Sequence, residues 1–286
     1  LTGITKTFVP FYSSFPEIFR IFVAYNFITI IMRPLIFISN DDGVHAKGLN
    51  ELVAWVKDMA DVVVMAPDGP RSGSAAAITS IVPVTYKKVS EEPGVSIYSC
   101  SGTPVDCVKL AFETVLPRRP DLVLSGINHG DNASVNVHYS GTMGVVFEGC
   151  LKGIPSIGFS LADACADADF TALQPYIRTL VSQILAEGLP QGVCLNVNFP
   201  AGKNLRGLRV CRMGWGCWNC EWKSAAHPAG KPAYWLTGQY ENLEPDATDT
   251  DVWALSQGYA SVVPIRLDVT AYDCLENMKT KLEEIS

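Results

Sequence analysis

Short apolar runs that alternate with segments of helical periodicity constrain the fold of this chain most. Leu35–Ile38 is a continuous apolar run, and apolar residues then recur at helical spacing from Leu49 to Val56. The same alternation predicts strands at Val62–Ala66, Leu122–Leu124, Ser156–Ser160 and Val193–Val197, and helices at Pro104–Phe112, Thr142–Leu151 and Phe170–Leu185. Strands and helices in this order predict an α/β, Rossmann-like fold with a mostly parallel sheet and helices on both faces.

Two stretches of the chain depart from this alternation. Val82–Val89 and Val95–Cys100 predict a β excursion around a turn at Glu92-Pro93-Gly94. From 208 to 258 the sequence is irregular and rich in aromatic residues, which indicates a β-rich arm. We therefore expect a catalytic Rossmann-like domain at 32–207, the arm at 208–258, and a last strand and helix at 259–286.

The first 31 residues need a separate interpretation. The apolar run Ile18–Ile31 follows Lys6 and Arg20, as in a signal peptide or an anchor, but it is too short for a membrane span. The chain opens with Leu, and Met32 comes directly before the first core strand. We expect Met32 to be the native start, residues 1–31 to be a non-native or disordered extension, and the protein to have no membrane partner.

Charge and cysteine content limit the classes of partner and the cellular compartment that the protein is expected to have. The formal net charge is -7 and no basic stripe is visible, which argues against nucleic acid as a partner. An acidic protein that handles phosphate generally needs a cation. The nine cysteines are odd in number and scattered, so they do not form a spaced disulfide framework. These observations favour a cytoplasmic protein.

Polar residues that follow the strands are the candidates for chemistry, because ligands of open parallel sheets bind beyond the carboxyl ends of the strands. Asp41 and Asp42 stand side by side after the first strand and would repel one another unless a cation neutralised them. Oxygen ligands of this kind suit Mg²⁺, Mn²⁺ or Ca²⁺. The alternative is that one Asp caps the next helix and the other is solvated.

Two further polar clusters lie at the same predicted rim. Arg71-Ser72-Gly73-Ser74 could meet a metal or an oxyanion, although alone it is an ordinary loop. The segment from Ser125 to Asn132 is followed by Ser140-Gly141-Thr142 at a helix start, where N–H groups favour an anion. Simple N-capping by Ser140 is the alternative. Together the three clusters predict a metal that polarises a phosphoryl group and activates water.

Several of these motifs occur together in one known family. They are Ser39-Asn40-Asp41-Asp42-Gly43-Val44-His45-Ala46, Ala66-Pro67-Asp68 with Arg71-Ser72-Gly73, Gly102-Thr103-Pro104 with Asp106-Cys107-Val108, Ser125-Gly126-Ile127-Asn128 with Gly130 and Asn132, and Tyr139-Ser140-Gly141-Thr142. From Met32 to about its C-terminus the chain resembles the SurE family, also called survival protein E, of 5′-nucleotidases.

The resemblance implies hydrolysis of nucleoside 5′-monophosphates with one divalent metal ion, Mg²⁺ or Mn²⁺, held by four residues: Asp41, Asp42, Ser72 and Asn128. It places Asn132, Ser140, Gly141 and Thr142 on the phosphate-binding side, and it implies a homodimer or homotetramer assembled through the C-terminal arm. The chain departs from the family pattern after Asn132, where it has Ala133, Ser134 and Asn136 instead of a Gly and then an Asp. We expect this departure to affect pocket polarity and substrate preference.

The resulting hypothesis assigns catalysis to Asp41, Asp42, Asn128 and Ser140. Asp41 is preferred as the group that orients or deprotonates water, and an aspartyl-phosphate intermediate stays open. A non-catalytic metal- and nucleotide-binding protein is the main alternative. A structural zinc module at Cys211, Cys217, Cys220 and His227 is another. A dinucleotide-dependent oxidoreductase is disfavoured, because no glycine fingerprint follows the first strand. His45 and His129 receive no catalytic role.

Overall fold

The structure is a computed structural model that describes residues 33–202 and 204–283. The expected extension at 1–31 and the expected start at Met32 lie outside the described residues. Within the described ranges, no helix is long and apolar enough to cross a membrane.

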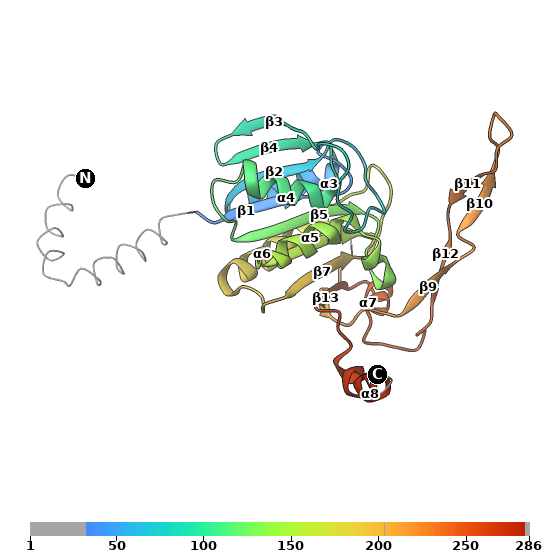
Figure 1. Ribbon diagram of the computed structural model, residues 1–286. Coiled ribbons are helices and arrows are strands. Elements are labelled where there is room, and N and C mark those ends of the chain that lie inside the picture. The colour runs from blue at the N-terminus through green and yellow to red at the C-terminus, as the bar shows by residue number, and fades with distance from the viewer. Residues whose placement is uncertain (1–32, 203, 284–286) are drawn as a thin grey trace, which may run out of the picture. The chain divides into compact units, whose positions relative to one another are not determined.

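A nine-stranded sheet forms the centre of the fold, in the order β3-β4-β2-β1-β5-β6-β7-β13-β8 (Figure 1). Its strands are β1 (Leu35–Ser39), β2 (Asp61–Pro67), β3 (Tyr86–Glu92), β4 (Val95–Cys100), β5 (Leu122–His129), β6 (Ser156–Leu161), β7 (Val193–Phe199), β8 (Leu208–Val210) and β13 (Ala260–Arg266). Only the β3–β4 and β7–β13 pairs are antiparallel. The prediction of a mostly parallel sheet is confirmed.

Helices cover both faces of this sheet, as predicted. The helices are α3 (Lys47–Val56), α4 (Pro104–Thr114), α5 (Gly141–Leu151), α6 (Gln174–Glu187), α7 (Asp251–Ser256) and α8 (Tyr272–Leu282), with 3₁₀ turns η1 (Ser134–His138) and η2 (Thr171–Leu173). Alternate residues of β1 divide between the faces. Ile36 and Ile38 pack with apolar residues of α3 and α6, whereas Leu35 and Phe37 pack with those of α4.

One strand is longer than the sequence pattern predicts. The apolar run ends at Leu124, but β5 continues to His129 through residues that were expected to be loop. Its pairing with β6 shifts register after Ser125 and resumes between Asn128 and Ser160. Gly126 makes this irregularity possible, because it has a φ of +115° and a Cβ atom there would lie 2.3 Å from the Phe159 carbonyl oxygen. β5 therefore carries polar residues at its carboxyl end.

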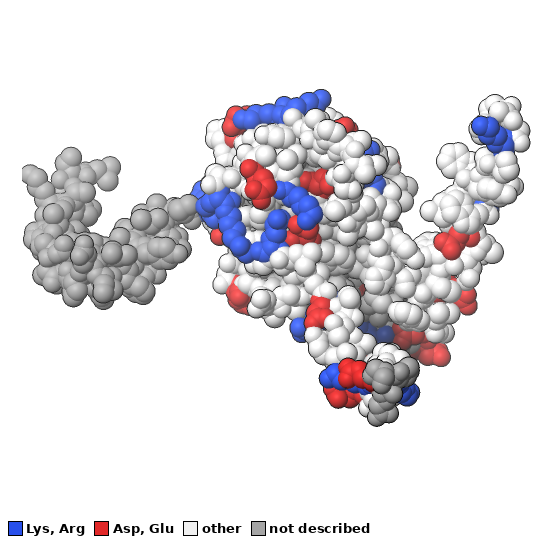
Figure 2. All heavy atoms as spheres, in the orientation of Figure 1, with Lys and Arg blue, Asp and Glu red and all other residues white. Residues whose placement is uncertain are grey.

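The segment after β8 leaves the main sheet and returns to it at α7. Within it, β9 (Gly216–Asn219) pairs with β12 (Gln239–Asn242), and β10 (Trp222–Ala225) pairs with β11 (Ala233–Leu236), each time antiparallel. A β-bridge joins Arg212 to Thr250 where the segment leaves and returns. We call residues 213–249 the extension. Figure 1 shows β10 and β11 at its outer end, and Figure 2 shows few charges there.

Candidate active site at the carboxyl ends of the strands

A tight turn presents the two aspartates directly after β1. The Asn40 amide donates to the Gly43 carbonyl oxygen at 3.0 Å, and the Gly43 N–H donates to Asn40 Oδ1 at 3.2 Å. Gly43 has a φ of +102°, in the region that favours glycine, and a Cβ atom there would lie 3.2 Å from the backbone of Gly69. The turn therefore fixes the backbone positions from which the side chains of Asp41 and Asp42 project.

Residues from all three polar clusters meet around Asp41. Its side chain is buried, and Oδ1 accepts a hydrogen bond of 2.5 Å from Thr142 Oγ1. Its carbonyl oxygen accepts a bond of 2.7 Å from the Arg71 N–H. A Cβ atom on Gly141 would lie 2.7 Å from Asp41 Cβ, so the glycine lets the helix start approach the carboxylate. The sheet thus brings together segments that are up to 100 residues apart in sequence.

Burial makes negative charge costly at both aspartates. The pKa of Asp41 is raised from 3.8 to about 6, mainly because burial disfavours its ionised form, and the neighbouring Asp42 adds to the rise while the Thr142 hydroxyl opposes it. Burial also raises the pKa of Asp42, which accepts a 3.2 Å bond from the His129 N–H. A cation beside the pair would relieve this cost.

The loop after β2 supplies hydroxyls to the same region. Ser72 is exposed and, within the described residues, makes no hydrogen bond to Asp41 or Asp42. The hydroxyl of Ser74 is buried without a hydrogen-bond partner in the described residues, and it would lie 2.8 Å from a Cβ atom on Gly141. A buried hydroxyl without a partner is costly unless a ligand satisfies it. Ser74 was named in the cluster but was not assigned a role from the sequence.

The end of β5 reaches Asp42 through the backbone N–H of His129, the residue after Asn128. Its amide nitrogen donates to the Gly130 carbonyl oxygen at 2.8 Å, which leaves the side-chain oxygen out of that bond. The next residue, His129, has its ring 5.0 Å from Phe170 between centroids and Nδ1 2.9 Å from the Cys165 carbonyl oxygen. The side chain of His129 is therefore engaged in packing, while its backbone N–H bonds to Asp42.

A buried network of amides holds Asn132. Its N–H donates to Asn198 Oδ1 at 2.7 Å, and its side-chain amide donates to Ser160 Oγ at 2.7 Å. Asn196 in turn donates to the Asn132 carbonyl oxygen at 2.8 Å and accepts from Asn198 at 3.0 Å. Motifs and periodicity alone do not predict the roles of Ser160, Asn196 and Asn198. The signal was two asparagines at alternate positions within the otherwise apolar strand β7.

The start of α5 completes the site. Ser140 Oγ accepts a 3.0 Å bond from the Met143 N–H, so its hydroxyl serves as the N-cap of the helix. A Cβ atom on Gly144 would lie 2.3 Å from the Ala75 carbonyl oxygen, so the loop after β2 packs closely on this helix. The first turn of α5 thus directs backbone N–H groups towards the region beside Asp41.

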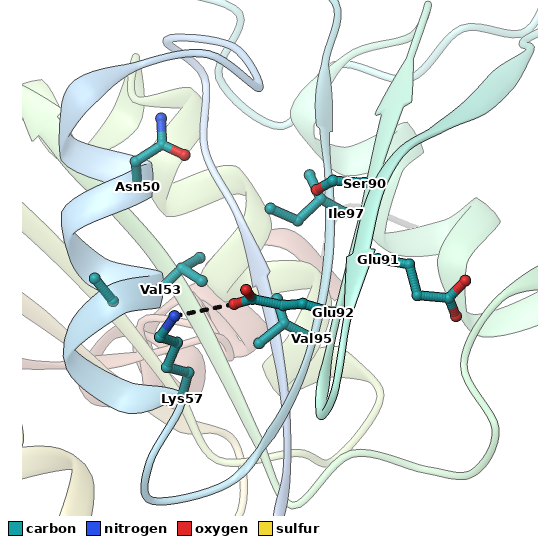
Figure 3. Close-up of a pocket in the computed structure, with 9 residues that line it drawn as sticks. Asn50, Val53, Lys57, Ser90, Glu91, Glu92, Val95 and Ile97 are labelled. Carbon is teal, nitrogen blue, oxygen red and sulfur yellow. Dashed lines mark hydrogen bonds and ion pairs between the residues drawn. The ribbon is translucent and has the colours of Figure 1, made fainter.

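Two hollows deserve comparison with this site. One, of about 310 Å³, lies between α3 and the β3–β4 pair, and Lys57 and Glu92 form a 3.0 Å ion pair there. Figure 3 shows these two side chains pointing towards each other, while Glu91 points away. None of its lining residues belongs to the polar clusters. A second hollow, of about 260 Å³, lies where the segment after β5 meets the extension, and it includes Asp131.

The zinc alternative finds no support in the geometry. Within the described residues, no group of three or more His, Cys, Asp and Glu side chains is placed to hold a metal. Cys211 Sγ contacts the Arg209 carbonyl oxygen, and His227 Nδ1 accepts from the Ala229 N–H at 3.1 Å. The aspartate pair is a different kind of candidate, because the further ligands that the resemblance implies there, Ser72 and Asn128, are neutral oxygen donors.

Known proteins resemble this chain over most of its length. The family model described as survival protein SurE matches residues 36–220. The 5′-nucleotidase SurE of Phocaeicola vulgatus is 60% identical over 247 residues, which cover 86% of this chain and 96% of that protein. The 5′-nucleotidase SurE of Bacteroides thetaiotaomicron is 51% identical over 88% of this chain and 98% of that protein. The crystal structure of the SurE protein from Aquifex aeolicus aligns with a TM-score of 0.74 and 35% identity, over 87% of this chain and 99% of that one.

Proposed function

The chain belongs to the SurE family, and from this premise we propose that it is a 5′-nucleotidase that uses one divalent metal ion to release phosphate from nucleoside 5′-monophosphates. The observation that carries the proposal is the convergence on Asp41 of the aspartate turn, the loop after β2 and the start of α5. The same name, 5′-nucleotidase SurE, is given to relatives that are 60% and 51% identical.

The proposed ligands fit a hard divalent cation. Two adjacent carboxylates of raised pKa, the Asn128 side-chain oxygen and the Ser72 hydroxyl are oxygen ligands of the kind that Mg²⁺ and Mn²⁺ prefer. The partnerless hydroxyl of Ser74 supports a ligand in the same region. When bound, the metal would neutralise the carboxylates and polarise the phosphate oxygens.

The protein's own groups would position the phosphate. The first-turn N–H groups of α5 would stabilise the developing negative charge by donating hydrogen bonds to the phosphate, while the Thr142 hydroxyl holds Asp41 and Ser140 holds the helix start in place. Asn132 would lie next to the phosphate. Its bonds to Ser160 and Asn198 would hold its side chain in one orientation. Positioning and electrostatics would supply most of the rate enhancement, as is general for phosphoryl transfer.

Asp41 is our preferred group for orienting the attacking water. The turn after β1 and the Thr142 hydroxyl hold this carboxylate in one position, as a group that orients water requires. Water would attack phosphorus, the ester P–O bond would break, and the nucleoside would leave as its 5′-alcohol after it gains a proton. An aspartyl-phosphate intermediate is the variant of this mechanism that trapping with acid quench would reveal.

We also propose a homodimer or homotetramer in the cytoplasm. On β10 and β11, Trp222 lies opposite Leu236 and Ser224 lies opposite Tyr234, so one face of the pair carries three large exposed side chains. A two-stranded pair of this kind is only marginally stable alone, which favours its burial against a second copy of the chain. All nine cysteines are unpaired, which suits a reducing compartment.

Phosphate release from a panel of nucleoside 5′-monophosphates tests the proposal. We expect release with Mg²⁺ or Mn²⁺, and loss of at least about a thousandfold with chelator or in Asp41→Asn. Asp246→Asn, at an exposed carboxylate of the extension, is the matched control and should keep full activity. A folded protein that binds metal and nucleotide without turnover would instead establish the alternative, a non-catalytic binding protein.

A further inference from the structure

The segment that links the candidate metal ligand to the candidate phosphate site also forms a hollow with the extension. This segment begins at Asn128 and ends at the start of α5, and four residues between them line the hollow: Asp131, Ala133, Ser134 and Asn136. The last three are the positions at which the resemblance indicates a departure from the family pattern, and where we expect substrate preference to be affected.

Two of these departures contact aromatic side chains of the extension. The Tyr240 hydroxyl donates to Ser134 Oγ at 2.8 Å, and Trp218 Nε1 donates to Asn136 Oδ1 at 2.8 Å. The two aromatic rings meet edge to face with centroids 5.8 Å apart. Ser134 itself is buried at a φ of +52°, and its N–H is held by the buried carboxylate of Asp251 at 2.8 Å. The walls of the hollow are therefore fixed in place.

The hollow has the features of a site for a planar ring. It measures about 260 Å³ and is lined by both aromatic rings and by apolar side chains from two directions, Ala162 of the loop after β6 and Val252 and Leu255 of α7. Small-molecule sites combine walls of this kind with a few placed polar groups. Aromatic side chains bind nucleobases irrespective of sequence, because every base presents a π face.

One carboxylate in the hollow can accept further hydrogen bonds. Asp131 Oδ1 accepts the Ala133 N–H at 3.1 Å and the Asn136 amide at 3.4 Å, whereas Oδ2 takes no hydrogen bond from the described residues. Asp131 also lies three residues after Asn128, so the two Cα atoms are at most about 11 Å apart. A nucleotide whose phosphate lies near Asn128 would therefore have this hollow within reach of its base.

We propose that this hollow is the nucleoside subsite and that Asp131 selects bases with an exocyclic amino group, adenine and cytosine, over their oxo counterparts. The inference rests on the proposed nucleotidase function. A carboxylate only accepts hydrogen bonds, so it pairs with the amino group of adenine or cytosine and repels the carbonyl oxygen of hypoxanthine or uracil. Trp218 and Tyr240 supply the apolar faces against which the base lies.

The first test compares matched substrates with wild type and Asp131→Asn at saturating Mg²⁺. The wild type should prefer AMP over IMP, and CMP over UMP, by about tenfold or more in kcat/KM. Asparagine keeps the Oδ1 acceptor for Ala133 but adds a donor, so the variant's AMP-to-IMP ratio should fall towards one. The Asp246→Asn control should keep the wild-type ratio. A wild-type ratio near one, or an unchanged ratio in Asp131→Asn, would overturn the proposal.

A second test separates base binding from folding. Trp218→Ala should raise KM for AMP about tenfold, with a fall in the ratio of kcat/KM for AMP to that for glycerol phosphate, which has no base. Trp218→Phe keeps a ring and should keep most of that ratio. Equal losses for both substrates would show a structural role and refute the subsite. If wild type released phosphate from neither substrate, the nucleotidase function itself would fail, a result distinct from the other two.

Discussion

At the scale of single residues, the cost of burying two carboxylates dominates the site. The sequence placed Asp41 and Asp42 beside one another, and elementary electrostatics then indicated a cation. The structure adds the Thr142 hydroxyl and the nearby Ser74 hydroxyl, neither of which spacing could assign to Asp41. Contacts of this kind join segments far apart in sequence, so they depend on the order of the strands in the sheet.

The raised pKa of Asp41 predicts a stability that depends on pH and on metal. Since the folded-state pKa of about 6 exceeds the ordinary 3.8, stabilisation by the protonated carboxyl is present below about pH 4 and is lost as pH rises towards 6. At pH 7 without metal this loss is about 3 kcal/mol. Asp41→Asn keeps an acceptor for Thr142 and should unfold about 5–10 °C above wild type.

Calorimetry at two pH values and with added Mg²⁺ checks this prediction. The difference between Asp41→Asn and wild type should shrink at pH 4, where the wild-type carboxyl is protonated. Mg²⁺ at pH 7 should raise the Tm of wild type and leave that of the variant unchanged. A variant that unfolds below wild type at pH 7 without metal would contradict the argument.

Gly141 predicts a second effect at this scale. Its φ needs no glycine, but a Cβ atom there would meet Asp41 Cβ at 2.7 Å and Ser74 Oγ at 2.8 Å. Gly141→Ala should therefore displace the carboxylate, lower phosphate release at least about tenfold, and weaken activation by Mn²⁺. Gly69→Ala is the control, because a Cβ atom at Gly69 meets nothing within 4 Å. Mn²⁺ titration of phosphate release measures both, and equal behaviour of the two variants would count against the steric account.

At the scale of elements, hydrophobic periodicity predicted most of the sheet and its helices. It failed at β5, where Ser125 to His129 was interpreted as loop because its side chains are polar. Those residues are nevertheless paired with β6, since polar side chains at the end of a strand can face a site instead of the core. Periodicity also predicts no role for Asn196 and Asn198. It shows which residues of a strand are apolar, but not which groups the polar residues of that strand bond to.

The amide network on β7 predicts a coupling between this strand and the site. Asn198→Ala would leave the buried N–H of Asn132 without its acceptor, which should cost about 1–3 kcal/mol of unfolding free energy and reduce phosphate release. Asn50→Ala removes an exposed amide bonded to the Ala46 carbonyl oxygen and should change stability by less than about 0.5 kcal/mol. Urea unfolding curves of the two variants give the comparison. A cost at Asn198 no larger than at Asn50 would refute the coupling.

At the scale of the whole molecule, composition indicated a separate β-rich segment, but the sequence could not say how it is joined to the sheet. β8 pairs with β13, and α7 packs against β13, so both ends of the 208–258 segment are attached to the main sheet. Such pairing brings together residues about 50 positions apart, which local patterns do not record. The extension proper therefore begins and ends beside one β-bridge.

The exposed face of β10 and β11 predicts the effect of removing its apolar side chains. Replacement of Trp222, Tyr234 and Leu236 by serine should convert the proposed oligomer to a smaller species, because these side chains share one face and are 60–65% exposed. Lys223→Ser, on the opposite face, should leave the mass unchanged. Sedimentation equilibrium gives the mass in each case, and an unchanged mass in the triple variant would exclude this face as the interface.

The β-bridge between Arg212 and Thr250 has an evolutionary consequence. A segment that enters and leaves a fold at one point can be lengthened, shortened or exchanged as a unit without disturbing the sheet beneath it. In this chain the same unit carries both the apolar outer face and two walls of the hollow around Asp131, Trp218 and Tyr240. Any descendant that replaces the unit to change the outer face therefore also changes which molecules fit in this hollow.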